Sequence, residues 1–246
     1  MDLHVALLLV VIGLFVGFAK TAIGGFGLLA VTIAVTIIPA RESTGVMLLL
    51  LLIGDLFAIK IYKDYVEWKF IRYLVAPVSI GLIFGAVFLL FSSDSSLKKF
   101  IGYIVVLLTI LYLLSQLISK NLEHLSSSKS KFIGLLFGIT AGFMSAVANA
   151  GGTPMSIYML LRKKEKKIFL GNSAWFFFIV NLSKIPIVLV LNLLSFQSLK
   201  YLLPAVPFIP IGAFVGRRII EKMNQKFFQN ITIFFSFLLG ISLIVI

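Results

Sequence analysis

The sequence has no cysteine and only two histidines, His4 and His124, among its 246 residues. It therefore holds neither disulfide bonds nor a thiol-based site, and a histidine metal cluster is not expected. Charged residues are also scarce, at 13% of the chain. Soluble domains carry roughly 25% charged residues, so this composition excludes a water-soluble globule.

Apolar residues fill the sequence instead. Hydrophobic residues make up 60% of the chain, and they form long runs such as Val46–Ile53 and Leu74–Phe91. The composition predicts an all-α polytopic membrane protein with eight to ten membrane segments, since a helix needs about 20 apolar residues to cross a bilayer. The apolar runs between charge clusters cover residues 3–19, 24–39, 44–59, 70–91, 100–118, 132–148, 154–161, 168–194, 200–216 and 227–246.

The formal net charge of +13 arises from Lys and Arg residues that cluster in loops. Loops 60–72, 120–131, 162–167 and 217–226 hold 16 of the 22 Lys and Arg residues, and the loops between them hold four. Cytoplasmic loops are enriched in these residues, so this bias explains the charge without a nucleic-acid partner. It predicts a multi-pass protein of the plasma (inner) membrane with both termini outside, provided that segments 1–2 and 6–7 each enter and return on one side.

The two halves of the sequence resemble each other. Gly45 with Asp55 ten residues later matches Gly171 with Asn181 ten residues later. Four Gly-x3-Gly pairs also correspond between the halves, and small residues at this spacing allow membrane helices to pack closely. These pairs begin at Gly13, Gly81, Gly138 and Gly212. We therefore predict an N-terminal repeat over residues 1–125 and a C-terminal repeat over residues 126–246.

The loop charges indicate that the repeats have opposite orientations, because basic loops of one half match nearly uncharged loops of the other. Inverted repeats place a substrate site near the bilayer midplane, between discontinuous helices, and open it to one side at a time. Each half also has a glycine-rich turn, at Ile23–Gly27 and at Ala150–Pro154.

The second of these turns is predicted to lie deep in the membrane. Only eight apolar residues, Pro154–Leu161, separate it from a basic run. A helix of that length measures about 12 Å, less than half of the roughly 30 Å hydrocarbon core. Amides at a helix N-terminus form an anion site, although the glycines are also explained by close packing in a sharp turn. The candidate substrate-binding residues at the turns are Gly24, Gly25, Asn149, Gly151, Gly152 and Thr153.

A charged residue inside an apolar run raises the free energy of membrane insertion, so its presence indicates a function. Lys184 lies one helical turn after Asn181, so both side chains occupy one face of the helix. Together they are suited to bind an anionic ligand. Alternatively, Lys184 forms an internal ion pair with Asp55. Asp55 is a candidate to carry a coupling proton, because burial favours the neutral carboxyl, or to be a salt-bridge partner. Lys20 and Thr21, beside the first turn, are further candidates for substrate binding, although Lys20 also fits a side chain that snorkels from a helix end.

Two inverted halves, each with a small-residue helix, a Gly-Gly turn and a short apolar helix, resemble the TauE/SafE family of sulfite and organosulfonate exporters. The resemblance covers almost the whole chain and rests on the turns Ile23–Gly27 and Ala150–Pro154, on Thr44-Gly45-Val46 and Gly171-Asn172-Ser173, and on the Asn181-x2-Lys184 pair. It implies an exporter of a small anion such as sulfite, sulfoacetate or a related sulfonate.

We therefore expect a secondary transporter that lies in the lipid bilayer and carries a small anionic substrate, with no cofactor and no metal. A homo-oligomer is compatible with this expectation. An enzyme is not expected, since Asp55 is the one acid well inside an apolar run. A cation carrier would need paired intramembrane carboxylates. The alternatives left open are a membrane subunit of a multi-component importer and a carrier of another small organic anion.

Overall fold

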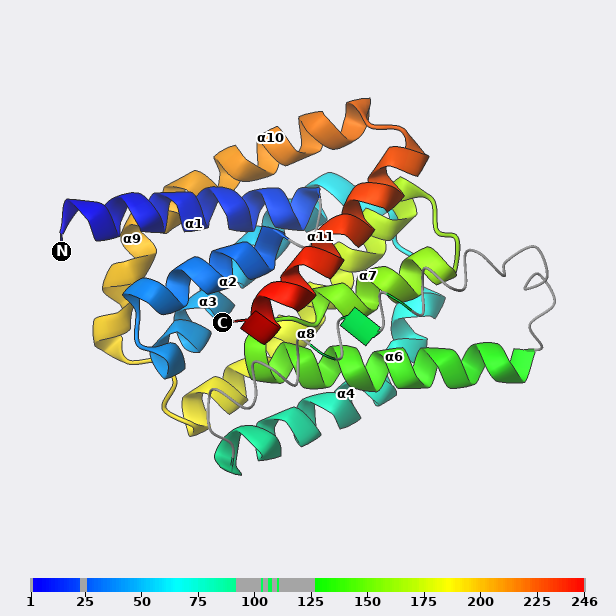
Figure 1. The fold of residues 1–246 in the computed structure, drawn as a ribbon, viewed down its shortest axis with the longest axis horizontal. Helices are drawn as coiled ribbons and strands as arrows, with labels where there is room; N and C mark the ends of the chain where they lie inside the picture. Colours follow the sequence, from blue (N-terminus) through cyan, green and yellow to red (C-terminus); the bar gives the residue numbers. More distant parts are fainter. Residues whose placement is uncertain are drawn as a thin grey trace. The chain divides into compact units, whose positions relative to one another are not determined.

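The computed structural model describes residues 2–22, 26–91 and 127–245, together with positions 103, 106, 107 and 110. Within these residues the chain forms helices and no strand (Figure 1). The long and short α-helices are α1 (Leu3–Thr21), α2 (Phe26–Ile37), α3 (Ala40–Tyr62), α4 (Trp68–Phe91), α6 (Ser127–Ala148), α7 (Gly152–Leu161), α8 (Lys166–Val190), α9 (Leu202–Ala205), α10 (Ile209–Lys222) and α11 (Gln225–Val245). Three 3-10 helices join them: η1 (Lys63–Tyr65), η3 (Phe196–Tyr201) and η4 (Val206–Phe208).

The prediction of an all-α membrane protein is confirmed. Five helical stretches in the described part of the chain are long and apolar enough to cross a bilayer. They cover Leu3–Thr21, Glu42–Tyr65, Trp68–Phe91, Lys166–Val190 and Phe196–Lys222. The predicted segment 100–118 falls outside the described residues except for the isolated positions given above.

α2 and α7 are each too short to cross the membrane, and only the shortness of α7 was predicted, from the second glycine turn. α2 has 12 residues and α7 has 10. At 1.5 Å per residue they measure about 18 and 15 Å, against about 30 Å for the hydrocarbon core. Each follows a longer helix and packs against it, α2 on α1 and α7 on α6. These two pairs are therefore helical hairpins with one short arm.

The chain divides into two compact units that do not follow its halves. Unit 1 comprises Met1–Ile71 and Glu165–Phe228, and unit 2 comprises Arg72–Lys164 and Gln229–Ile246. Each unit therefore draws elements from both halves of the sequence. The predicted repeats, 1–125 and 126–246, are defined by sequence order and stay a prediction.

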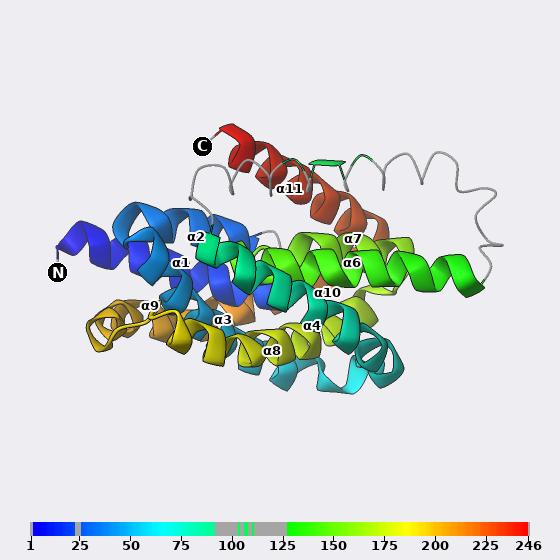
Figure 2. The same cartoon turned by 90° about the horizontal axis from the view of Figure 1, so that it is seen from below.

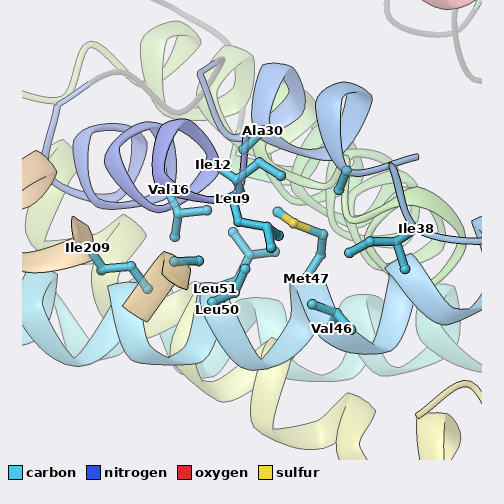
Figure 3. Close-up of a cluster of buried hydrophobic side chains, with 12 residues drawn as sticks. Leu9, Ile12, Val16, Ala30, Ile38, Val46, Met47, Leu50, Leu51 and Ile209 are labelled. Atoms are coloured by element: carbon cyan, nitrogen blue, oxygen red, sulfur yellow. The ribbon is translucent and has the colours of Figure 1, made fainter. Parts of the chain in front are cut away.

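The core of unit 1 is a set of aliphatic side chains from α1, α2 and α3 (Figure 3). Leu9, Ile12 and Val16 of α1 are fully buried against Met47 and Leu50 of α3. Burying each such side chain is worth about 1.5–3 kcal/mol relative to water, but hydrocarbon tails are as apolar as these side chains. In a bilayer, tight packing takes the place of the hydrophobic effect as the main driving force.

That packing is closest where α1 crosses α10 in unit 1. A Cβ atom added at Gly13 would lie 2.1 Å from the carbonyl oxygen of Ala205, and one at Gly17 would lie 2.0 Å from that of Ile209. From the other side, a Cβ at Gly212 would lie 2.1 Å from the carbonyl oxygen of Leu14. The prediction that these glycines serve helix packing is confirmed, because only glycine allows backbones this close.

Unit 2 repeats this contact with the corresponding helices, α6 and α4. A Cβ at Gly81 would lie 2.0 Å from the carbonyl oxygen of Ile139, and one at Gly142 would lie 2.2 Å from that of Val78. The first helix of each half therefore packs on a helix from the other half, α1 on α10 and α6 on α4. Because of this exchange, each compact unit contains helices from both halves of the sequence.

Candidate functional site

The candidate site in unit 1 is centred on the carboxylate of Asp55, in α3. Its Oδ1 lies 2.7 Å from Nζ of Lys20, near the end of α1. Its Oδ2 accepts a hydrogen bond of 2.7 Å from Nδ2 of Asn181, in α8. Asp55 is 0% exposed and Asn181 is 2% exposed. Three helices from the two halves of the chain thus meet at one buried carboxylate.

The carboxylate lies near the middle of the α3–α8 pair, whose helices run side by side (Figure 2). At one end, a Cβ on Gly45 would lie 2.3 Å from the carbonyl oxygen of Leu193; at the other, one on Gly171 would lie 2.7 Å from that of Tyr65. Asp55 is ten residues from both Gly45 and Tyr65, which is about 15 Å at 1.5 Å per residue. Asp55 is therefore halfway between the two close contacts of the helix pair.

Two residues of this site correspond to each other in the predicted internal repeat. Asp55 and Asn181 occupy equivalent places in the two halves, ten residues after Gly45 and Gly171, and they are hydrogen-bonded to each other. Gly45 and Gly171 are also equivalent, and each packs on backbone atoms of the helix pair. Contacts between equivalent residues are expected on a two-fold axis that relates inverted repeats.

Lys184 is the second ammonium group of this cluster. It lies in α8, one turn beyond Asn181, and is 3% exposed. Lys20 and Asp55 are the charged groups that act on it electrostatically. The sequence left open whether Lys184 serves a ligand or interacts with Asp55, and the structure brings Lys184, Asp55 and Lys20 together in one buried cluster.

Phe177 is a member of the site that the sequence analysis missed. Nζ of Lys20 lies 4.9 Å from the centre of its ring, a cation–π contact. Phe177 stands four residues before Asn181 and seven before Lys184, so all three lie on one face of α8. That spacing was visible in the sequence, but an aromatic residue in an apolar helix does not stand out from its neighbours.

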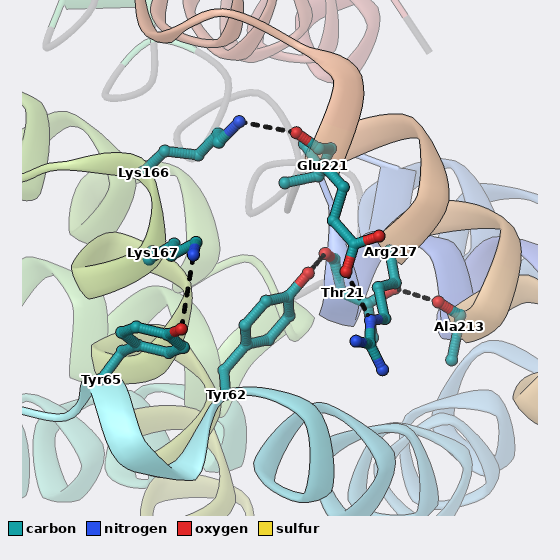
Figure 4. A network of polar contacts seen from close by, with 9 residues as sticks. Thr21, Tyr62, Tyr65, Lys166, Lys167, Ala213, Arg217 and Glu221 are labelled. Atoms are coloured by element: carbon teal, nitrogen blue, oxygen red, sulfur yellow. Dashed lines mark hydrogen bonds and ion pairs between the residues drawn. The ribbon is translucent and has the colours of Figure 1, made fainter.

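Thr21, a predicted ligand residue, has a structural position instead. Its hydroxyl lies 3.0 Å from the carbonyl oxygen of Gly17 and 2.9 Å from that of Ala213, so its one proton is already shared. The hydroxyl of Tyr62 donates a 2.8 Å hydrogen bond to the carbonyl of Thr21 (Figure 4). Thr21 thus ties the end of α1 to α10 and α3, directly beside Lys20.

Further contacts fasten the same end of unit 1. Nζ of Lys166, at the start of α8, donates to the carbonyls of Ile220 and Met223 at the end of α10. Arg217 and Glu221 form an exposed ion pair of 2.7 Å on α10 (Figure 4). These contacts lie where the sequence places basic loops, so they hold the helix ends and not the buried cluster.

The second glycine turn lies in unit 2, between α6 and α7. Asn149 adopts a left-handed conformation with φ of 53°, which asparagine tolerates better than most residues. The amides of Asn149, Ala150 and Thr153 donate to carbonyls within the turn or the preceding helix. Thr153 is buried, and Pro154 stands in the first turn of α7, as expected.

Gly151 has a packing role in this turn. A Cβ there would lie 2.5 Å from the carbonyl oxygen of Ala141 and 2.8 Å from Cβ of Ser145. Gly152 is the first residue of α7. Gly24 and Gly25, the candidates in the first turn, lie outside the described residues. Of the predicted site residues, the structure brings Lys20, Asp55 and Asn181 into contact, and it buries Lys184 one helical turn beyond Asn181.

Among the described residues, no group of three His, Cys, Asp or Glu side chains is placed so that it could hold a metal ion. Comparison with protein families finds a match over residues 9–243 to a family model described as "Sulfite exporter TauE/SafE". Comparison with curated proteins and with solved structures finds no match.

Proposed function

The chain belongs to the sulfite exporter TauE/SafE family, and from this membership and the charge cluster we propose that it exports a small sulfur-containing anion, such as sulfite or an organosulfonate, as a secondary transporter. The match covers residues 9–243, nearly the whole chain, so the family's role as a multi-pass membrane transporter applies to this protein. The family does not distinguish between sulfite, sulfoacetate and other sulfonates.

The observation that carries the proposal is the buried cluster of Lys20, Asp55, Asn181 and Lys184 in unit 1. Charged groups in the middle of a membrane protein are rare and mark substrate pathways. Here the Asp55 carboxylate contacts the ammonium of Lys20 and the side-chain amide of Asn181, and Lys184 is buried one helical turn beyond Asn181. In our proposal the ammonium of Lys184 attracts the substrate oxyanion and Asn181 orients it by a hydrogen bond.

Asp55 is our candidate for the residue that carries a coupling proton. It is the one acidic side chain that is buried in the described part of the chain. The charged groups that face it are Lys20 from α1 and Lys184 from α8. An anion that draws Lys20 away would leave two negative groups side by side, which favours uptake of a proton.

In unit 2, we propose that Gly151 and Gly152 supply amide donors to an oxyanion at the N-terminus of α7, with Asn149 and Thr153 beside them. Helix N-termini attract anions through their amides and their dipole. The packing role of Gly151 is compatible with this, because a glycine also lets a ligand approach the backbone closely. Gly24 and Gly25 are proposed for the same role in the first turn.

The test is anion binding to the purified protein, measured by thermal shift with sulfite, sulfoacetate, taurine, sulfate and chloride. A ligand that binds only the folded state raises the melting temperature as its concentration rises. We expect a sulfur anion to stabilise the wild type but not Lys184→Ala, and to stabilise the control Lys69→Ala, which removes the same charge from an exposed position. Efflux of that anion from proteoliposomes should fail in the same variant.

Three results would contradict the proposal. If organic carboxylates stabilise the protein and sulfur anions do not, the chain is a carrier of another class of anion. If a cation stabilises the wild type and Asp55→Asn abolishes the effect, the site is built for cations. Efflux that requires a separate purified protein would indicate the alternative of a subunit in a multi-component system.

A further inference from the structure

One face of α10 is apolar and exposed. Ile211, Phe214 and Val215 on this face are 50%, 54% and 44% exposed, whereas the opposite face carries the glycine contact with α1. α10 ends the stretch Phe196–Lys222, which is long and apolar enough to cross a bilayer. The exposed apolar side chains of such a stretch match the acyl chains of lipids, which are equally apolar.

The same face of α10 ends in positive charge. Arg218 follows Phe214 by four residues and Lys222 follows Arg218 by four, so the three side chains form one stripe on the helix surface. Lys226, in the first turn of α11, is the next basic residue, and all three basic side chains are exposed. They belong to the loop 217–226, which is predicted to be cytoplasmic. The stripe thus runs from an apolar surface to a basic one at the membrane interface.

Two adjacent arginines at this end have different partners. Arg217 forms the 2.7 Å ion pair with Glu221 (Figure 4). The guanidinium of Arg218 instead lies over the ring of Phe214, 4.5 Å from its centre, and forms no ion pair with a described residue. Stacking occupies the flat face of a guanidinium and leaves the N–H donors on its edge for an acceptor. Phosphate is the acceptor that this edge binds with two parallel hydrogen bonds.

We infer that the end of α10 binds the headgroup of an anionic phospholipid. Arg217 and Glu221 offset each other, which leaves the charges of Arg218, Lys222 and Lys226 to attract the lipid. Lys and Arg side chains near the cytoplasmic surface attract its anionic lipids in this way. Arg218 holds the phosphate, and the acyl chains lie along the apolar part of the stripe. A phosphatidylcholine headgroup has the same phosphate but adds a positive group, which these side chains repel.

The bound lipid stabilises unit 1. α10 packs on α1 through its other face, and the carbonyl of Ala213 accepts a hydrogen bond from the hydroxyl of Thr21. A lipid on the outer face therefore holds α10 against α1 beside Lys20. This inference concerns the outside of the helix pair and does not depend on which substrate the protein carries.

The experiment compares phosphatidylglycerol with phosphatidylcholine of the same acyl chains, added to the purified full chain in a nonionic detergent. Bound lipid is counted by native mass spectrometry, and stabilisation is measured by thermal shift. We expect phosphatidylglycerol to bind more tightly and to raise the melting temperature further. Arg218→Gln should weaken its binding about fivefold or more, since that is the effect of one charge near an anionic surface.

Two variants separate a site from diffuse attraction. Arg218→Lys keeps the charge but loses the planar fork, so it should bind phosphatidylglycerol between Arg218→Gln and the wild type. The control Lys63→Gln removes an exposed charge from η1, in another loop that is predicted to be cytoplasmic, and should bind like the wild type. Because Arg218 is exposed, both of its variants should melt like the wild type in the absence of lipid.

Three results would overturn the inference. Equal weakening in Arg218→Gln and Lys63→Gln would mean that the attraction is diffuse. Equal binding of the two lipids would mean that the headgroup charge is not recognised. A dimer that Phe214→Ser dissociates in light scattering would mean that a second copy of the chain covers this face. The proposed export of a sulfur anion would stand in each case, because its assay uses the buried cluster.

Discussion

The contact between α1 and α10 makes a quantitative prediction for Gly17→Ala. The added Cβ would lie 2.0 Å from the carbonyl oxygen of Ile209 and 2.7 Å from the amide nitrogen of Ala213, where ordinary contact begins at 3.4 Å. Both neighbours are backbone atoms, so no side chain can rotate away. The helices must separate by the difference, 3.4 minus 2.0 or 1.4 Å.

A separation of this size also weakens the neighbouring contacts at Gly13 and Gly212. A gap of only 0.5–1 Å removes about a quarter to a half of the dispersion attraction between two atoms. Overpacked cores lose about 1–3 kcal/mol and sometimes more. We expect Gly17→Ala to lie at the upper end, with about 3 kcal/mol of stability lost.

The matched control is Gly27→Ala in α2, where, among the atoms that the structure describes, the added Cβ meets only Cβ of Ala19, at 3.6 Å. Alanine is favoured over glycine in a helix by roughly 0.5–1 kcal/mol, so this variant should be as stable as the wild type or slightly more stable. Both are measured by SDS-driven unfolding in mixed micelles. Equal loss of stability in the two variants would refute the assignment of α1–α10 as the close contact.

Two further predictions concern unit 1 and the membrane topology. Tyr62→Phe removes the buried hydrogen bond to the carbonyl of Thr21 and should cost about 0.5–1.5 kcal/mol in the same assay, whereas Tyr65→Phe, at an exposed side chain, should cost nothing measurable. Because the chain has no cysteine, the single variants Asp64→Cys and Ser195→Cys can each be labelled specifically in intact cells. A membrane-impermeant thiol reagent should label Ser195→Cys and not Asp64→Cys, since residue 64 lies in a basic loop that is predicted to be cytoplasmic. The reverse result would show that the predicted orientation is inverted.

The helices were predictable from the sequence because membrane-spanning helices need long apolar runs and the loops between them carry the charged residues. The short helix after the second glycine turn follows from the basic run at residues 162–167, which has to stay at the membrane interface. The packing role of the Gly-x3-Gly pairs was equally visible, since that spacing has one common structural use.

The members of the buried cluster were predictable, but their pairing was not. The sequence assigned Lys184 and Asn181 to one helix face, and it identified Asp55 as the counterpart of Asn181. It did not show that Lys20 would form an ion pair with Asp55. Nor did it show that the hydroxyl of Thr21 would hydrogen-bond to the carbonyl oxygens of Gly17 and Ala213. These contacts depend on how α1, α3, α8 and α10 pack, and that packing joins residues far apart in the chain.

The exchange of helices between the two halves has a consequence for biosynthesis. Thr21 of α1 meets its partner Ala213 of α10 192 residues later in the chain. At about 5–20 residues per second, the ribosome needs roughly 10–40 s to make that interval. During this time the glycine surface of α1 faces lipid or another protein, so newly inserted α1 can pack against the wrong neighbour until α10 has been made. A chain truncated after its first half would remain in that state.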